Sequence, residues 1–185
     1  MSSDETVTAL FAMAVTAEER CKELYSGLAK RFSHLPDAAR FWMGMAMDEV
    51  QHHQKLENVR DSLTLQQLHS AADHVMIEKA RQALTFSAAE SSNSVATLDD
   101  AYALARELER SEVNTVFAFV MNEFIPSEKQ KDFVLLQLEH HTQKIVKFPE
   151  TFGDAEWRRS IAAGPMPAGA QSALSRRETM SAPDK

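Results

Sequence analysis

Cysteine and glycine are scarce in this sequence, and their scarcity excludes several kinds of site. Among 185 residues there is one cysteine, Cys21, so the chain can form no internal disulfide and holds no pair of cysteines spaced for zinc. A reducing compartment, the cytoplasm, is therefore expected. With only five glycines, neither a glycine-rich phosphate loop nor a GxSxG nucleophile motif can be read.

Long apolar runs and an excess of basic charge are also missing. No run approaches the roughly 20 apolar residues of a membrane span, and no basic stretch precedes the first apolar run as in a signal peptide. The formal net charge is −7, which argues against nucleic-acid phosphates or an anionic membrane as partners. The composition, 44% hydrophobic and 25% charged, is typical of a globular domain.

Helical patterns run through most of the chain. Apolar residues recur at three- and four-residue spacing, and cap residues such as Thr97 and Ser127 precede the periodic stretches. Prolines such as Pro126 lie in the breaks between them. We therefore predict four long helices, at about 4–33, 37–63, 97–124 and 127–148.

A long connection joins the two predicted helix pairs. It covers about 64–97, and we expect one or two short helices near 65–86 followed by a polar stretch, AAESSNS. Short turns make each pair antiparallel, and one long crossover between pairs is the connectivity of ferritin-like four-helix bundles. We thus predict an all-α bundle over 4–148, followed by an extended or disordered arm over 149–185.

Carboxylates and imidazoles occur on the helix faces that the apolar pattern assigns to the core. Glu49 and His52, three residues apart, are neighbours on a stripe with Met45 and Leu56. The candidates are Glu18 on the first helix, Glu49 and His52 on the second, Glu109 and Glu112 on the third, and His141 on the fourth.

Such a set cannot be buried without compensation. An unpaired buried charge costs several kcal/mol, while a whole domain is stable by only about 5–15 kcal/mol. These groups must therefore lie at a rim, take up protons, or be neutralised by cations. A pair of divalent ions would offset most of the charge, and oxygen-rich ligands with a few imidazoles suit iron or manganese.

Three motifs occur in order on the predicted helices: E-x₆-Y (18–25), E-x-x-H (49–52) and E-x-x-E (109–112). With these motifs, the sequence over about 6–148 resembles the rubrerythrin branch of the ferritin-like superfamily. Tyr25 is then expected to pack in the core with its hydroxyl bonded to a ligand carboxylate.

The resemblance implies a non-haem di-iron, or Fe/Mn, centre held by the six candidate residues. It implies oxidation of Fe(II) by O₂ or hydrogen peroxide, or reduction of peroxide with electrons from an external donor, in a homodimer. The rubredoxin module of many rubrerythrins is absent because it needs four cysteines. The fourth helix also departs from the family, because Leu138 stands where its E-x-x-H motif has glutamate, and Gln137 is at best a weak ligand.

Each candidate also has a simpler interpretation. Glu49 and His52 would make a hydrogen-bonded pair between helices, Glu109 and Glu112 a solvated charged face, and His141 a core residue. At the level of function, the alternatives are a metal-binding protein without turnover and a ferritin-like interaction module whose site has decayed. The missing glutamate on the fourth helix motivates the interaction module.

Overall fold

The computed structural model describes residues 5–85 and 87–161, apart from the side chains of Ala89, Glu90 and Glu112. Helices dominate this part of the chain and it contains no strand, so the prediction of an all-α protein is confirmed. None of the helices within it combines the length and the apolar character that crossing a membrane would require.

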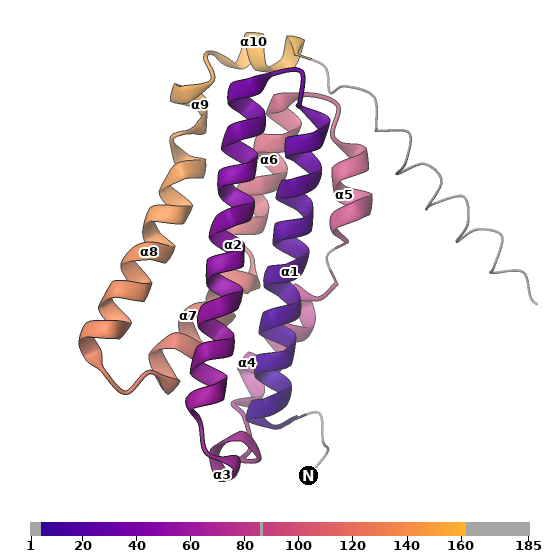
Figure 1. Cartoon of the computed structure of the whole chain (residues 1–185). Helices are drawn as coiled ribbons and strands as arrows, with labels where there is room; N and C mark the ends of the chain where they lie inside the picture. Colours follow the sequence, from indigo (N-terminus) through magenta and orange to yellow (C-terminus); the bar gives the residue numbers. More distant parts are fainter. Residues whose placement is uncertain (1–4, 86, 162–185) are drawn as a thin grey trace, which may run out of the picture.

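The first two helices form a long antiparallel pair. α1 (Val7–Arg31) and α2 (Pro36–Ser62) pack against each other along their lengths (Figure 1). Thr6 caps α1 by accepting a hydrogen bond from the backbone N–H of Ala9. Proline at the start of α2 suits the first turn of a helix, where no backbone donor is needed. Both helices lie close to their predicted bounds.

The connection after α2 holds three short helices: α3 (Leu65–Leu68), α4 (His74–Ala83) and α5 (Ala88–Ser94). It leads back to the end of the molecule where α1 meets α2, and both α4 and α5 pack against α1 (Figure 1). The stretch AAESSNS, expected to be a polar connection, is α5. Its Ser92 is buried and packs at Gly27 of α1, so contact with α1 outweighs the weak helix propensity of serine.

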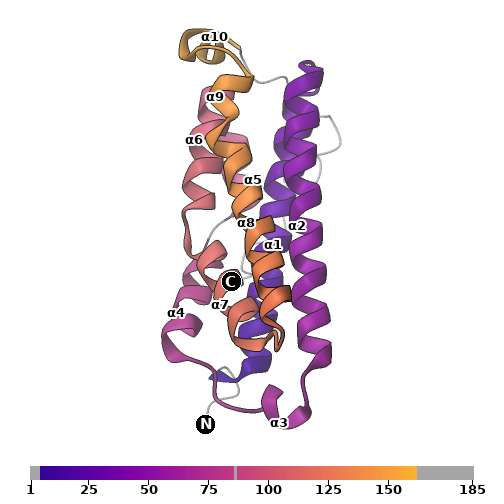
Figure 2. The same ribbon diagram turned by 90° about the vertical axis from the view of Figure 1, so that its left-hand side faces the viewer.

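The prediction of one continuous helix over 97–124 is wrong. This stretch is divided into α6 (Leu98–Glu109) and α7 (Glu112–Phe124), which follow each other in Figure 2. Ser111 accepts a hydrogen bond from the N–H of Val113 and so caps a new helix. The division makes Glu109 the last residue of α6.

The chain then turns into α8 (Glu128–Val146), α9 (Phe148–Thr151) and α10 (Ala155–Ser160). The predicted extended arm, 149–185, is therefore wrong for its first part. Asp154 caps α10, and the buried side chain of Arg158 donates to the Asp99 carboxylate over 3.1 Å. Residues 162–185 lie outside the described part of the chain.

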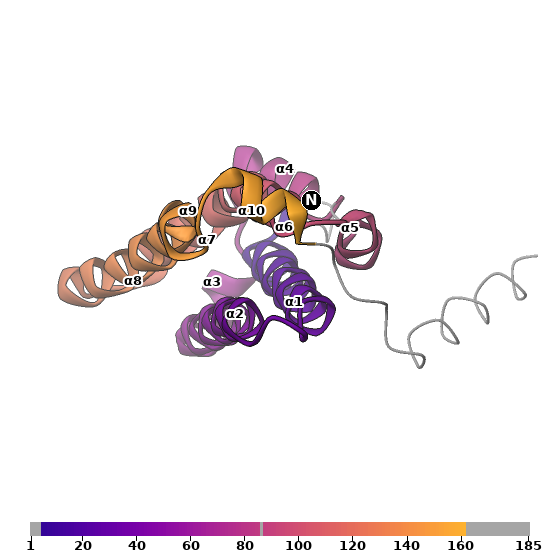
Figure 3. The ribbon, with the colours of Figure 1, turned by 90° about the horizontal axis from the view of Figure 1, so that it is seen from above.

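Two apolar clusters fill the interior. One contains Tyr25, Trp42 and Phe148, and the other contains Phe11 and Phe117. Along α1, α2 and α8, the chain passes from one cluster to the other between residues 15 and 17, 46 and 56, and 138 and 145. Glu49, His52 and His141 lie within these changeovers, and Glu18 directly follows one. Viewed along the long axis, α5 and α8 lie on opposite sides of α6 (Figure 3).

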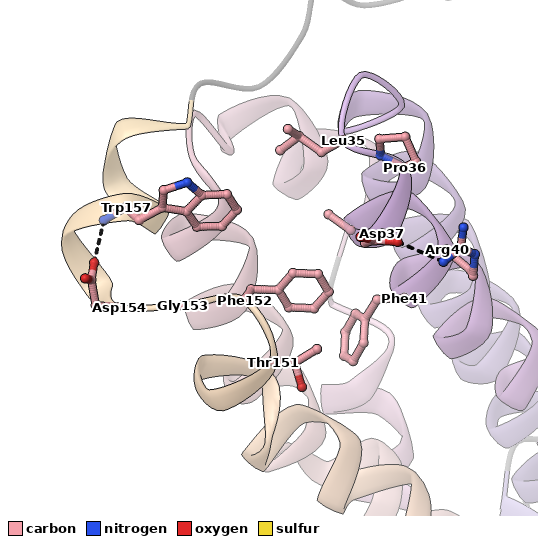
Figure 4. A pocket seen from close by; sticks show the side chains of 11 residues that line it. Leu35, Pro36, Asp37, Arg40, Phe41, Thr151, Phe152, Gly153, Asp154 and Trp157 are labelled. Carbon is pink, nitrogen blue, oxygen red and sulfur yellow. Dashed lines mark hydrogen bonds and ion pairs between the residues drawn. The ribbon is translucent and has the colours of Figure 1, made fainter.

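An apolar pocket lies at the end of the molecule where α2 begins and α9 and α10 follow α8. Its volume is about 920 Å³. Four large side chains point into it in Figure 4: Leu35, Phe41, Phe152 and Trp157. None of the candidate metal ligands lines this pocket.

Candidate metal centre

Five of the six candidate residues come together between the two apolar clusters. They are Glu18, Glu49, His52, Glu109 and His141, and all of their side chains are buried. They form two groups, Glu18–Glu49–His52 and Glu49–Glu109–His141, in each of which the possible ligand atoms lie within 4.8 Å of one another. Residues from four separate helices thus converge on one place.

The first group joins α1 to α2. His52 Nδ1 lies 2.9 Å from Glu49 Oε2 and 3.5 Å from Glu18 Oε2. The i, i+3 spacing on α2 brings Glu49 and His52 together. Glu18 Oε2 is buried and takes part in no hydrogen bond with the described residues. A buried acceptor whose nearest donor atom is 3.5 Å away is poorly satisfied, and a cation can satisfy this oxygen.

The second group joins α2, α6 and α8. His141 Nε2 lies 2.8 Å from Glu109 Oε1 and 3.2 Å from Glu49 Oε1. The two oxygens of Glu49 therefore face different imidazoles, Oε2 that of His52 and Oε1 that of His141. A carboxylate in this position can bridge two cations.

Two further side chains hold the carboxylate of Glu109. The hydroxyl of Tyr25 donates to Glu109 Oε1 over 2.5 Å, as expected for a tyrosine beside a ligand carboxylate. Asn114 Nδ2 lies 2.9 Å from Glu109 Oε2 and 2.8 Å from the Glu109 backbone oxygen. Sequence reasoning missed Asn114, since its role depends on the division between α6 and α7.

His141 is oriented by a partner that the sequence patterns did not single out. Its Nδ1 lies 3.0 Å from Asp48 Oδ2, and Lys144 Nζ donates to the same oxygen. Carboxylates that hold the second nitrogen of a metal-binding histidine are common. The available signal was the other acid in DEVQHH, which is one residue before Glu49 and so turns toward α8.

Three further positions that the sequence analysis considered are Glu112, Leu138 and Gln137. Glu112 begins α7, but its side chain lies outside the described part, so its role stays a prediction. Leu138 packs against the apolar cluster of Phe11 and Phe117. Gln137 Oε1 is buried without a hydrogen-bond partner in the described residues, and Gln137 lines a small hollow together with His52 and His141.

Protons compensate the buried charges when no cation is present. Burial raises the pKa of Glu18 to about 8. Burial lowers the pKa of both imidazoles, but hydrogen bonds to carboxylates outweigh it and raise the pKa of His52 to about 9 and that of His141 to about 12. Burial would likewise raise the pKa of Glu49, yet hydrogen bonds from His141 and His52 hold it below its ordinary value.

The donor set fits hard or borderline divalent metal ions. Carboxylate oxygens and imidazole nitrogens are typical ligands of iron and manganese. Cys21 is buried nearby, and burial raises the pKa of its thiol well above the ordinary value, so it stays neutral. The two buried oxygens without partners, on Glu18 and Gln137, are further acceptors that a cation can satisfy.

Comparisons with models of protein families, with curated proteins and with solved structures gave no match. The resemblance to rubrerythrins therefore stays a prediction that rests on three motifs. What the structure itself shows, over residues 5–85 and 87–161, is a helical fold with two buried Glu/His groups that could each hold a metal ion.

Proposed function

We propose that this protein is a ferritin-like four-helix bundle that binds a pair of divalent metal ions, iron or Fe/Mn, between its helices. The shared carboxylate of Glu49 carries the proposal, because each of its oxygens faces one of two imidazoles on different helices. If Glu49 and His52 were only a hydrogen-bonded pair, a second imidazole beside the other oxygen of Glu49 would not be needed. The division of the five residues into two groups that share one glutamate is the arrangement expected of a two-metal site.

The residues have separate tasks in this proposal. Glu18 and His52 would hold one ion, Glu109 and His141 would hold the other, and Glu49, which belongs to both groups, would be shared between them. When bound, iron supplies the redox chemistry, namely oxidation of Fe(II) by O₂ or peroxide, or reduction of peroxide with an external electron donor. The protein side chains set ligand positions and exclude bulk water from a site that is nearly closed.

The helix order supports the ferritin-like assignment. α1 and α2 form one pair, and α6 with α7 and α8 form the other. The connection through α3, α4 and α5 returns along the molecule, so α6 starts at the end where α1 finishes (Figure 1). A single long connection between two helix pairs is what ferritin-like bundles are expected to have, in contrast to bundles with three short loops, and it supports the proposal.

Metal-dependent stability tests the proposal. We expect the melting temperature to rise when Fe(II) or Mn(II) is added without oxygen, because binding to the folded state alone stabilises it by about 2.7 kcal/mol at a hundredfold excess over Kd. Glu49→Gln should abolish most of this rise, whereas Glu23→Gln, on the exposed face of α1, should preserve it. An equal rise in both variants, or none in the wild-type protein, contradicts the proposal.

A metal-binding protein without turnover is the second candidate. Leu138, at the position where the family has glutamate, favours it, since the second ion then has fewer carboxylate ligands. Steady-state consumption of hydrogen peroxide by the iron-loaded protein, with a chemical reductant present, separates the two. Many turnovers per chain, lost in Glu49→Gln, support the enzyme. Metal binding without turnover supports the alternative.

A further inference from the structure

A small hollow between α1 and α2 opens toward the candidate metal centre. Its volume is about 220 Å³. The buried side chains of Glu18 and Glu49 form its inner wall. Glu19, His53 and Glu57 line it nearer to solvent, with side chains that are 54%, 26% and 33% exposed. The hollow therefore links solvent to residues of both Glu/His groups.

Negative charge predominates in this hollow. Glu19, Glu49 and Glu57 bring three carboxylates, and Glu18, whose pKa is raised to about 8, brings a fourth carboxyl group; the single ammonium among the lining residues is that of Lys22. At the outer end, His53 lies between two acids. Its Nδ1 is 3.8 Å from Glu19 Oε1, and its Nε2 is 3.2 Å from Glu57 Oε2.

The guanidinium of Arg60 also lies at this end, 3.5 Å from Glu57 Oε1 and 2.9 Å from Asp61 Oδ1. It contacts the Glu57 oxygen opposite to the one that faces His53. The pairing therefore leaves the oxygen that is turned to His53 free of the guanidinium.

Glu18 gives this hollow an unfilled acceptor at its inner end. Its side chain is only about 2% exposed, and Oε2 takes part in no hydrogen bond with the described residues; its polar contact is the 3.5 Å ion pair with His52 Nδ1. An acidic surface alone needs no ligand, because water and salt solvate it. A buried carboxyl oxygen whose only polar contact is this long one, at the bottom of an acidic hollow, is a place where a cation lowers the free energy.

A second hollow, on the opposite side of α2, is lined by more positive charge than the first. It lies between α2 and α8, has a volume of about 90 Å³, and is lined by Lys55 and Lys144 as well as Asp48. The carboxylate of Asp48 already accepts hydrogen bonds from Lys144 and His141. Two ammonium groups beside a narrower opening oppose the approach of a divalent cation.

We propose that divalent metal ions reach the buried Glu/His groups through the acidic hollow between α1 and α2, where Glu19, His53 and Glu57 form an outer, transient binding position. This inference rests on the proposed function, because a route needs a metal centre at its end. It assigns a role to three partly exposed residues that the metal centre itself does not use. It also predicts that the charges of these residues change the rate of metal uptake and leave the number of ions bound at equilibrium unchanged.

The rate of Co(II) uptake by metal-free protein tests the route, with the visible absorbance of bound Co(II) as the signal. In Glu19→Gln/Glu57→Gln we expect uptake to slow about three- to tenfold at low salt, since the attracting charge is removed. The final amount bound should equal that of the wild-type protein. Lys22→Glu, which adds a carboxylate to the same hollow, should accelerate uptake.

The matched control is Glu23→Gln/Asp37→Asn, which removes two exposed carboxylates from α1 and α2. Neither residue lines the hollow, and Asp37 pairs with Arg40, which does not line it either. This control should bind Co(II) at the wild-type rate. Salt near 1 M should reduce the differences in uptake rate between the variants and the wild-type protein, because charges are then screened within about 3 Å. Equal rates in both double variants overturn the route and leave the proposed function standing. No Co(II) binding by the wild-type protein overturns the proposed function, and the route with it.

Discussion

Glu49 is the residue on which both Glu/His groups depend. The sequence predicted it, together with His52 and Glu18, because helical spacing alone places them among apolar neighbours. Asp48 and Asn114 escaped prediction for a physical reason. Asp48 contacts His141, 93 positions away across a helix interface, and Asn114 contacts Glu109, five positions away across a helix break. The periodicity of a single helix describes neither contact.

Metal uptake should release protons, because three of the proposed ligands hold protons at neutral pH. Glu18 has its pKa raised to about 8, His52 to about 9 and His141 to about 12, so each must lose a proton to offer a lone pair. We expect about three protons per chain at about pH 7. Calorimetric titration in buffers of different ionisation enthalpy measures this number. Release of less than one proton would mean that these groups are not the ligands.

Asp48→Asn should weaken metal binding while leaving all proposed ligands in place. Asp48 fixes the orientation of His141 through Nδ1, and loss of such a partner typically costs about 10- to 100-fold in metal affinity. Competition with a chromophoric chelator gives the affinity. Asp61→Asn, at the exposed end of α2, is the control and should bind like the wild-type protein. Equal affinities for the two variants would remove Asp48 from the site.

At the scale of elements, prediction succeeded where one helix is long and regular. α1, α2 and α8 begin and end near the expected residues. It failed at the division between α6 and α7, where apolar periodicity continues across Arg110 and Ser111 and hides the new cap. The polar sequence of α5 hid a helix in the same way, because burial against α1 stabilises it.

The division between α6 and α7 should be necessary for the position of Glu109. In Asn114→Ala, the backbone oxygen and the carboxylate of Glu109 both lose a donor, so we expect the free energy of unfolding to fall by about 1–2 kcal/mol. Chemical denaturation measures the change. Asn122→Ala, at an exposed position of the same helix, should cost about 0.5 kcal/mol or less. Similar losses in the two variants would show that the contact is unimportant.

At the scale of the whole molecule, the polar groups divide an otherwise apolar interior. Two hydrophobic clusters enclose them, so the carboxylates and imidazoles have little water to solvate them. The metal-free fold is then stabilised by protons held inside. Sequence patterns predicted the burial of each residue separately, but the pairing of charges depends on how four helices meet, which no single helix encodes.

The metal-free protein should become less stable as pH rises. The pKa of Glu18 is raised from 4.5 to about 8 and that of His52 from 6.5 to about 9, so the folded chain binds more protons than the unfolded chain in this range. Their stabilisation is complete below the unfolded pKa values and is lost as pH passes the folded ones. Melting temperatures of the metal-free protein should therefore fall from about pH 5 to about pH 9. A rise over this range contradicts the assignment.

The number of metal ions per chain tests the central claim most directly. The protein would be purified without chelators, loaded with Fe(II) in the absence of oxygen, freed of excess metal and measured by elemental mass spectrometry. Two Glu/His groups that share Glu49 predict close to two irons per chain, and fewer than one in Glu49→Gln. No bound iron in the wild-type protein, or an unchanged amount in Glu49→Gln, would contradict the claim that these buried side chains form a metal centre.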